Sequence, residues 1–567
     1  MKNTGNGGRE GNRLKQLIIL GAGIMQGPAI SIAGEMGLET VVADGDSGAP
    51  CAPLADRFEH IDLKDKEGVE ALARELKAGG RLAGIMTAGT DFSATVAWVA
   101  ERLGLPGIPY ETALNASDKG RMRLRFKEAG VPSPEFLTLS GMPPGDFAFP
   151  FDFPAVIKPV DNMGGRGCRR LDSRRDLALA LPEAIGFSRS GRAIVEEYMD
   201  GPEFSVDALV YHGEITICGL ADRHIYFPPY FIEMGHTMPA DLSEKETASL
   251  LEVFIEGVRA LGLLDRNAVG AAKGDVKLCS RGPMIGEIAA RLSGGYMSGW
   301  TYPYASGVDL TKGAIQAAIG QRPDCLDATR SWTCAERAFI SIPGKVRSIH
   351  GLRDAKAAPY VKDIFLRAGK GGRVSFPENN VSKCGNVIAA APGRKSAMDA
   401  AGFAARAVLI RLEAPDEATA AFLEAGSVPA AADGAWPPNA FPAGPALIAA
   451  LARLPDPAVR VEESPPGTGA APEPALVPFP AFTESGLKDH AGRGVEESLD
   501  AVRAITGLSL PAASPDGTAA GGLLGRRFWA ALIRGGYQGA AYIADLLCGG
   551  RSGGPGAGKG AEEAAGD

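Results

Sequence analysis

The chain has 567 residues, of which 45% are hydrophobic and 22% charged, a composition typical of a globular protein with three or four domains. Its net charge of -8 and the lack of a basic stripe argue against a nucleic-acid binder. The cysteines are scattered and the histidines lack metal-site spacing, so neither a disulfide framework nor a zinc cluster is expected. Without a signal peptide or a run of eighteen apolar residues, the chain is expected to be cytoplasmic and free of membrane contact.

Residues 14–115 alternate between strand and helix patterns. An apolar strand at residues 17–20, a glycine turn at 21–27, a helix at 28–36 and a second strand at 40–43 predict a βαβ unit of a doubly wound parallel sheet. The turn departs from the dinucleotide fingerprint G-x-G-x-x-G, because Gln26 stands in place of its third glycine. A dehydrogenase therefore remains an alternative, which tight NAD binding without ATP binding would select.

A helix is predicted next, with Ser117 or Asp118 as its N-cap and Gly130 as its stop. Lys119 would lie in the first turn, where the helix dipole disfavours a cation unless an anion compensates it. A surface lysine and a lysine that binds phosphate are both compatible with this position.

A strand that ends at Lys158 is followed by a loop with three glycines, Gly164, Gly165 and Gly167. Glycines allow backbone N–H groups to turn toward phosphate oxygens, and a lysine at the strand end supplies a positive charge beside them. The pattern favours a phosphate-binding loop over a simple hinge.

Residues 275–279 and 284–289 are predicted to form a β-hairpin that turns at residues 280–283. Asp275 would then lie opposite Glu287, with Arg291 on the same face as Glu287. Opposed carboxylates destabilise a sheet unless a cation lies between them, and Mg²⁺ binds carboxylate together with phosphate oxygens. The hairpin therefore indicates a metal–nucleotide site, although an isolated hairpin of this kind could equally be a solvated charged edge.

These parts, with the run V-E-E-Y-M-D-G-P-E-F-S-V at residues 195–206 and E-I-A-A-R at 287–291, follow one another in an order that resembles the ATP-grasp superfamily. The resemblance covers residues 14 to about 413, and the superfamily includes D-alanine:D-alanine ligase, biotin carboxylase and the L-amino-acid ligases. It implies an α/β protein in which a Rossmann-like domain precedes a two-lobed α+β ATP-grasp fold and a small C-terminal lobe. Because the motifs occur once, a complete carbamoyl-phosphate synthetase is excluded.

The resemblance also implies roles for individual residues. Asp275 and Glu287 would bind Mg²⁺ or Mn²⁺, while Lys158 and Arg291 would stabilise the transferred phosphoryl group. Most family members carry Asn two residues after the second carboxylate, whereas this chain has Ala289, which leaves the number of bound metal ions open. The residues expected to bind ATP are Lys119, Lys158, Gly164, Gly165 and Gly167 at its phosphates, Glu196, Glu197 and Met199 at adenine, and Glu203 at the ribose hydroxyls.

Residues 221–240 are rich in His, Tyr and Phe, and in family members this region faces the substrate pocket. Each polar side chain in it is equally compatible with a structural hydrogen bond. The candidate substrate residues are Arg223, His224, Glu233 and His236.

Beyond residue 413 the composition shifts: thirteen of the 41 prolines and sixteen alanines fall between residues 421 and 480, which predicts a linker with little regular structure. Helices are predicted at residues 395–411, 501–508 and 525–547. The helical tail is expected either to dock on the enzyme, to form a homodimer or to bind a partner. The expected parts are a disordered 1–13, a βαβ domain 14–115, an ATP-grasp domain 116–330 with lobes 116–191 and 192–330, a C-terminal lobe 331–412, a linker 413–480, a helical tail 481–550 and a flexible end 551–567.

Together the motifs predict an ATP-dependent ligase that phosphorylates a small carboxylate to an acyl phosphate and transfers it to an amine. Its partners would be small molecules. A bicarbonate-phosphorylating carboxylase of the purine-synthesis type and a non-catalytic ATP-binding regulatory or scaffold protein are the alternatives.

Overall fold

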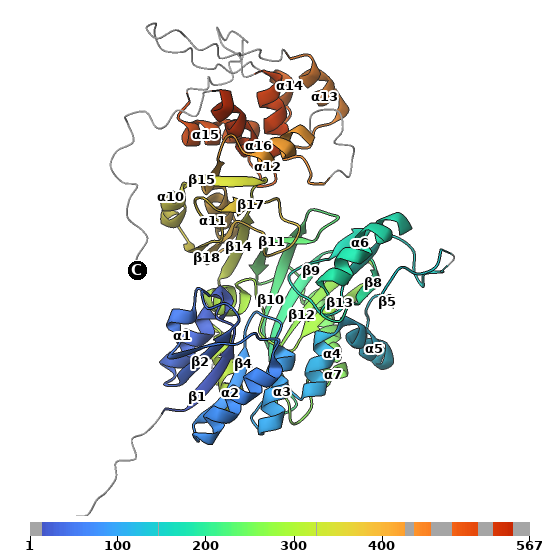
Figure 1. Cartoon of the computed structure of the whole chain (residues 1–567), viewed down its shortest axis with the longest axis vertical. Coiled ribbons are helices and arrows are strands. Elements are labelled where there is room, and N and C mark those ends of the chain that lie inside the picture. Colours follow the sequence, from blue (N-terminus) through green and yellow to red (C-terminus); the bar gives the residue numbers. More distant parts are fainter. Residues whose placement is uncertain are drawn as a thin grey trace, which may run out of the picture. The chain divides into compact units, whose positions relative to one another are not determined.

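The computed structural model describes residues 14–145, 147–324, 326–425, 436–454, 479–508 and 525–547 (Figure 1). The expected disordered start and flexible end lie outside these residues. The chain divides into two compact units: the first contains Met1–Arg337, Glu378–Val381 and Ile388–Ala401, and the second contains Ala338–Pro377, Ser382–Val387 and Gly402–Asp567. No helix in the part of the chain that the structure describes is both long and apolar enough to span a membrane.

The first unit begins with a parallel sheet in the order β3-β2-β1-β4, as the alternating pattern predicted. Its strands are β1 (Gln16–Leu20), β2 (Glu39–Asp44), β3 (Arg57–His60) and β4 (Leu82–Thr87), and its helices are α1 (Gly27–Glu35), α2 (Lys66–Ala78) and α3 (Ser93–Leu103). The side chain of Gln26 fills the glycine turn, where its Oε1 accepts from Gly23 N at 2.9 Å and its amide donates to the Ala88 carbonyl. A backbone approach to pyrophosphate in this turn, which the dinucleotide fingerprint requires, is therefore blocked by a side chain.

The next part is a four-stranded sheet in the order β5-β8-β6-β7. Its elements are α4 (Tyr110–Ser117), α5 (Lys119–Ala129), β5 (Phe136–Leu139), β6 (Ala155–Pro159), β7 (Arg169–Leu171), α6 (Arg174–Phe187) and β8 (Ala193–Glu197). The predicted cap and stop of α5 are confirmed: Asp118 accepts a hydrogen bond from Arg121 N at 3.0 Å, and Gly130 adopts a left-handed conformation. Lys158 lies near the end of β6, a strand paired on both sides.

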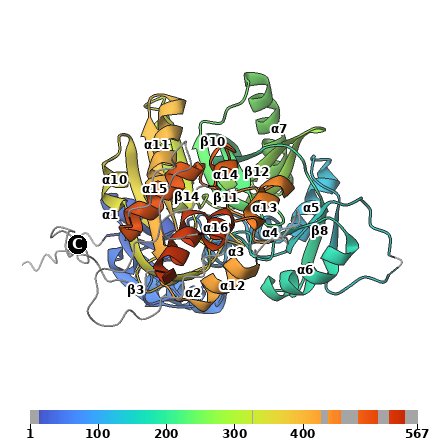
Figure 2. The same cartoon turned by 90° about the horizontal axis from the view of Figure 1, so that it is seen from above.

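A larger antiparallel sheet follows, with the order β13-β12-β9-β10-β11-β14 within the first unit. Its elements are β9 (Glu203–Tyr211), β10 (Glu214–Tyr226), β11 (Ile232–Met238), α7 (Glu244–Ala260), β12 (Val269–Cys279), β13 (Gly282–Ala289) and β14 (Thr333–Phe339). The predicted hairpin is confirmed, since β12 and β13 pair with Asp275 opposite Glu287. Helix α7 lies beside β12 (Figure 2) and buries Phe254 against Gly274 and Val276, so it covers the face opposite to Asp275.

The second unit contains a three-stranded sheet in the order β17-β15-β19 and a helical tail with its own core. Phe441, Phe482, Leu499, Trp529 and Leu532 are among the buried residues of that core. The elements of this unit include β15 (Gly344–His350), α10 (Leu352–Ala357), β16 (Val361–Leu366), β17 (Arg373–Val374), β19 (Leu409–Leu412), α12 (Glu417–Ala425), α13 (Pro445–Ala452), α14 (Pro480–Thr483), α15 (Val495–Thr506) and α16 (Arg526–Leu547).

Two helices predicted for this region are present with other bounds, and the predicted lack of regular structure in the proline-rich stretch is wrong for its described residues. The helix expected at residues 395–411 is α11 (Arg394–Ala407), because the residues after it pair with β15 as β19. The helix expected at 501–508 begins at Val495. The proline-rich stretch contains α12 and α13, where Leu447 and Leu451 are buried in the tail core. Proline in the first turn of α13 is compatible with helix because that N–H has no intrahelical partner.

We predict that Gly201→Ala destabilises the chain more than Gly37→Ala. Both glycines have left-handed φ, +77° at Gly201 and +75° at Gly37. A Cβ added at Gly201 would lie 2.1 Å from the Leu278 carbonyl oxygen, whereas a Cβ added at Gly37 would have no atom within 4 Å. The left-handed backbone costs each alanine variant about 1–2 kcal/mol, so this strain cancels when the two are compared. A lower thermal midpoint for Gly201→Ala therefore reports the clash of its Cβ with β12. Equal midpoints by circular dichroism would contradict the tight contact between this turn and β12.

Candidate active site

One face of the large sheet carries charged residues in adjacent strands. Asp275 and Glu287 face each other across β12 and β13, and the next row pairs Lys273 with Ala289 and with Asp207 of β9. Residues two apart on a strand share a face, so both rows project from the side that α7 leaves uncovered. We call this set the charged face; its members are Glu203, Asp207, Arg223, Lys273, Asp275 and Glu287.

Helix α5 brings a cation to the charged face. Its first residue, Lys119, places its Nζ 3.4 Å from Glu287 Oε1 and donates a hydrogen bond to the Asn162 carbonyl at 2.8 Å. Burial would lower the pKa of Lys119, but Glu287 and Asp91 outweigh it and raise the pKa. Glu287 is thus the anion that a lysine in the first turn of a helix requires.

The carboxylate of Glu287 is surrounded by positive charge. Burial alone would raise its pKa, but Lys119, Lys158 and Lys273 lower the pKa to about 2. The group is therefore ionised at physiological pH. Among the described residues no three or more His, Cys, Asp or Glu side chains form a metal-binding group. Two opposed carboxylates nevertheless fit Mg²⁺, which commonly takes one or two protein carboxylates and completes its shell with phosphate oxygens and water.

Lys158 forms an ion-pair triad with Glu196 and Arg123. Glu196 Oε2 lies 2.7 Å from Lys158 Nζ, and Glu196 Oε1 lies 2.9 Å from Arg123 Nε. Arg123 also donates to the carbonyl of Gly286, next to Glu287, at 2.6 Å. Although burial would raise the pKa of Glu196, Arg123 and Lys158 lower it, so the carboxylate stays ionised. The triad joins α5, β6, β8 and β13 at the point where the predicted phosphate and metal residues meet.

The remaining predicted ATP residues lie around this triad. Glu197 pairs with Arg281 at 2.8 Å, and a Cβ added at Gly286 would lie 3.7 Å from Met199 Cε. The predicted contacts of these two residues with adenine stay predictions. The loop glycines Gly164, Gly165 and Gly167 all have positive φ, at +71°, +76° and +65°.

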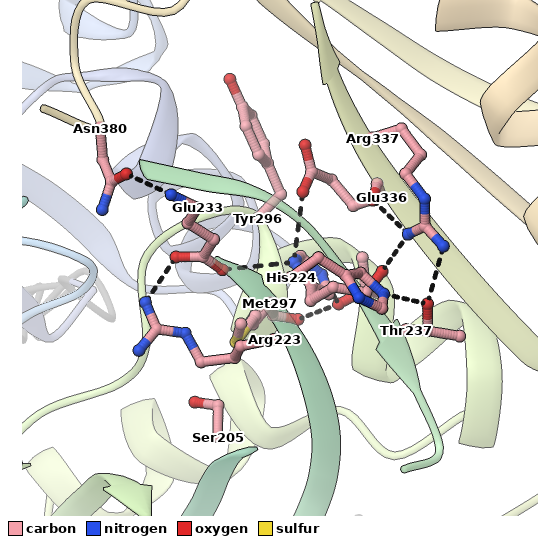
Figure 3. A network of polar contacts seen from close by, with 12 residues as sticks. Ser205, Arg223, His224, Glu233, Thr237, Tyr296, Met297, Glu336, Arg337 and Asn380 are labelled. Atoms are coloured by element: carbon pink, nitrogen blue, oxygen red, sulfur yellow. Dashed lines mark hydrogen bonds and ion pairs between the residues drawn. The ribbon is translucent and has the colours of Figure 1, made fainter. Parts of the chain in front are cut away.

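Arg223 connects the predicted ribose, substrate and metal residues, and Figure 3 shows its contact with the substrate residue Glu233. Its guanidinium contacts Glu203, lies 2.7 Å from Glu233 Oε2 and lies 2.9 Å from Asp275 Oδ1. Burial would lower the pKa of Arg223, but Asp275, Glu233 and Glu203 raise it. Glu203, predicted to accept hydrogen bonds from ribose, thus already contacts a guanidinium.

The two candidate histidines lie in different surroundings. His236 Nδ1 is 3.8 Å from Glu233 and 3.4 Å from Glu336, and these carboxylates raise its pKa against the effect of burial. His224 hydrogen-bonds Thr237 at 3.0 Å, beside Arg337 in Figure 3, and burial followed by Arg337 lowers its pKa to about 4. Of the two histidines, His236 contacts the Arg223–Glu233 cluster, and its raised pKa favours the protonated form.

Arg291 lies two residues after the end of β13, and the N-terminal parallel-sheet domain contributes Asp91 near it. Gly89 N donates to the Leu292 carbonyl at 3.2 Å, which packs the loop after β4 against the residue following Arg291. Asp91, in this loop, is 14% exposed at its side chain, and burial raises its pKa although Arg291 and Lys119 oppose the shift. The site is therefore formed by side chains from both the parallel-sheet domain and the antiparallel sheet.

Sequence reasoning missed four charged residues of the site: Asp91, Arg123, Lys273 and Glu336. Lys273 and Arg123 had local signals, since Lys273 lies two residues before Asp275 and Arg123 lies one helical turn after Lys119. Asp91 and Glu336 come from distant segments and had none.

Comparisons with known proteins identify two domains in the chain. Residues 151–298 match the model of the ATP-grasp domain, and residues 338–413 match that of L-amino acid ligase C-terminal domain 2. The chain contains an ATP-grasp domain. The predicted resemblance to the ATP-grasp superfamily and the mixed α/β fold class are confirmed.

Several proteins are similar to this ATP-grasp chain. An L-amino acid ligase from Bacillus licheniformis is 21% identical with a TM-score of 0.61, over 71% of this chain and all of that chain. Human carnosine synthase 1 is 25% identical over 54% of this chain and 40% of its own length. An uncharacterized protein from Sinorhizobium fredii, y4rH, is 28% identical over 60% of this chain and 71% of its own. The chain thus spans less than half the length of the carnosine synthase.

We predict that Glu196→Gln destabilises the protein at pH 7 by about 3–5 kcal/mol, because it leaves the buried Arg123 and the partly buried Lys158 without a counter-charge. The folded-state pKa of Glu196 is lowered, so the carboxylate contributes stability above its unfolded pKa and loses it as the pH falls through the lower folded value. The difference from wild type in chemical denaturation should therefore shrink in acid.

The neighbouring Glu197→Gln is the control, because its partner Arg281 is 61% exposed and such pairs contribute at most about 1 kcal/mol. A Glu196→Gln variant no less stable than Glu197→Gln would show that the triad does not fix the site.

Proposed function

We propose that the chain is an ATP-dependent ligase that activates a small carboxylate as an acyl phosphate and joins it to an amine. The observation that carries the proposal is the position of Glu287, which lies opposite Asp275 in register and 3.4 Å from Lys119 Nζ, with the charges of Lys158 and Lys273 also acting on it. A metal–triphosphate complex needs carboxylates that bind the metal ion and cations that bind the phosphate oxygens. Without such a ligand or a compensating cation, two carboxylates opposite each other destabilise a sheet.

The chemistry follows from charge and position. A carboxylate oxygen of the first substrate attacks the γ-phosphorus of ATP and ADP leaves; the amine nitrogen then attacks the acyl carbon, and phosphate leaves as the ammonium loses its proton. Lys119 and Lys158 would neutralise the phosphate oxygens, and Arg291 would stabilise the charge on the transferred phosphoryl group. When bound, Mg²⁺ at Asp275 and Glu287 would supply Lewis-acid stabilisation of the phosphates.

We further propose that the carboxylate substrate is an α-amino acid. Glu233 can pair with an ammonium group, and it lies between Arg223 and His236 next to the predicted phosphoryl site. The similarity to an L-amino acid ligase and to a carnosine synthase supports this class of substrate. In this proposal His236 and Glu336 position Glu233, while His224 has a structural role.

The test is a screen for phosphate release with ATP, Mg²⁺ and pairs of amino acids. We expect release with at least one pair, and Glu287→Gln should lower the rate at least 100-fold, or about 2.7 kcal/mol. Glu214→Gln is the matched control on the same sheet, because Glu214 is an exposed residue at the start of β10 paired only at the surface with Arg322.

Release that requires only bicarbonate would select the carboxylase instead. Binding of ATP without turnover across the whole panel would select the non-catalytic alternative and overturn the proposal.

A further inference from the structure

Lys273 lies inside the proposed metal site. On β12 it stands two residues before Asp275, pairs in register with Ala289 on one side and Asp207 on the other, and its Nζ contacts the Asp275 carboxylate. Its side chain is 13% exposed, so the ammonium lies near the two carboxylates and has little contact with solvent. Its charge also acts on Glu287 and Asp207.

The residue across from Lys273 cannot bind a metal ion. Ala289 is 5% exposed and offers only a methyl group at the place where a second oxygen or amide ligand could project from β13. A pair of divalent ions 3.5–4 Å apart needs shared carboxylates and further oxygen ligands around each ion. Among the described residues no group of three or more acidic, His or Cys side chains supplies them.

A lysine differs from a metal ion in ways that matter here. Its ammonium is a compact single charge with three hydrogen-bond donors, so it can contact a carboxylate and a phosphate oxygen at once. Unlike a metal ion, the ammonium does not coordinate oxygen ligands, and its positive charge repels a divalent ion placed beside it. The small Ala289 leaves the row open for this side chain, and Asp207 and Asp275 flank the lysine within the sheet.

We propose that the ammonium of Lys273 takes the place of a second divalent cation at the Asp275–Glu287 pair, so that the nucleotide binds with one metal ion. This inference rests on the proposed function, because it concerns the same nucleotide site. Lys273 is then a binding residue for the phosphate chain as well as a partner of Asp275.

The experiment counts Mn²⁺ ions bound by the full chain with adenylyl imidodiphosphate, a non-hydrolysable ATP analogue, from the electron paramagnetic resonance of free Mn²⁺. We expect one Mn²⁺ per nucleotide in wild type and two in K273A/A289N, which removes the ammonium and adds an amide ligand. The matched control is K277A/A289N, which adds the same ligand but removes the lysine on the other side of Asp275, and it should bind one.

Two ions in wild type, two in K277A/A289N, or one in K273A/A289N would each overturn the inference. If a double variant does not fold, nucleotide affinity decides: Lys273→Gln should weaken binding of the Mn²⁺–analogue complex about tenfold and Lys273→Arg less than threefold, and equal affinities would contradict the role. A wild-type chain that binds no nucleotide would instead remove the proposed function itself.

Discussion

The placement of Glu287 among cations is the constraint on which the site depends. A carboxylate opposite Asp275 is unfavourable in a sheet unless positive charge compensates both groups. The compensation comes from Lys119 on a helix, Lys158 on another sheet and Lys273 on the neighbouring strand. Because these cations arrive from separate elements, the charge balance exists only when the two sheets and α5 are packed together.

The Arg123–Glu196–Lys158 triad fixes that packing. Arg123 is 1% exposed and Glu196 is 2% exposed, so each charge needs its partners. The hydrogen bond from Arg123 to the Gly286 carbonyl carries this constraint to the residue before Glu287. A structural ion-pair network is thus connected directly to the residues proposed to bind phosphate and metal.

Arg223 links the part of the site proposed to bind ATP with the part proposed to bind substrate. Arg223 contacts Asp275 on the metal side and Glu233 on the substrate side, and it stays charged because three carboxylates surround it. His236 and Glu336 extend the network away from the phosphates. A single guanidinium therefore couples the two halves of the site, and a ligand that displaces Glu233 from Arg223 would also alter the surroundings of Asp275.

The sequence by itself determined the elements whose signals are local. The hairpin with Asp275 opposite Glu287 followed from strand alternation and its turn residues, and α5 followed from Asp118 and Gly130, whose capping roles depend on a few neighbouring residues. The order of the motifs was enough to recognise an ATP-grasp domain. Composition failed in the tail, because Leu447 and Leu451 are buried by contacts with distant helices that override a proline-rich pattern.

Only the tertiary structure decided which charges meet. Asp91 and Glu336 reach the site from segments far from the hairpin in sequence, and nothing in their neighbours indicates where they lie. Glu196 is held by Arg123 and Lys158, and His224 hydrogen-bonds Thr237 whereas His236 lies near Glu233 and Glu336. Such pairings depend on distances across packed elements, and electrostatic interaction depends on those distances and on burial, which local sequence patterns do not specify.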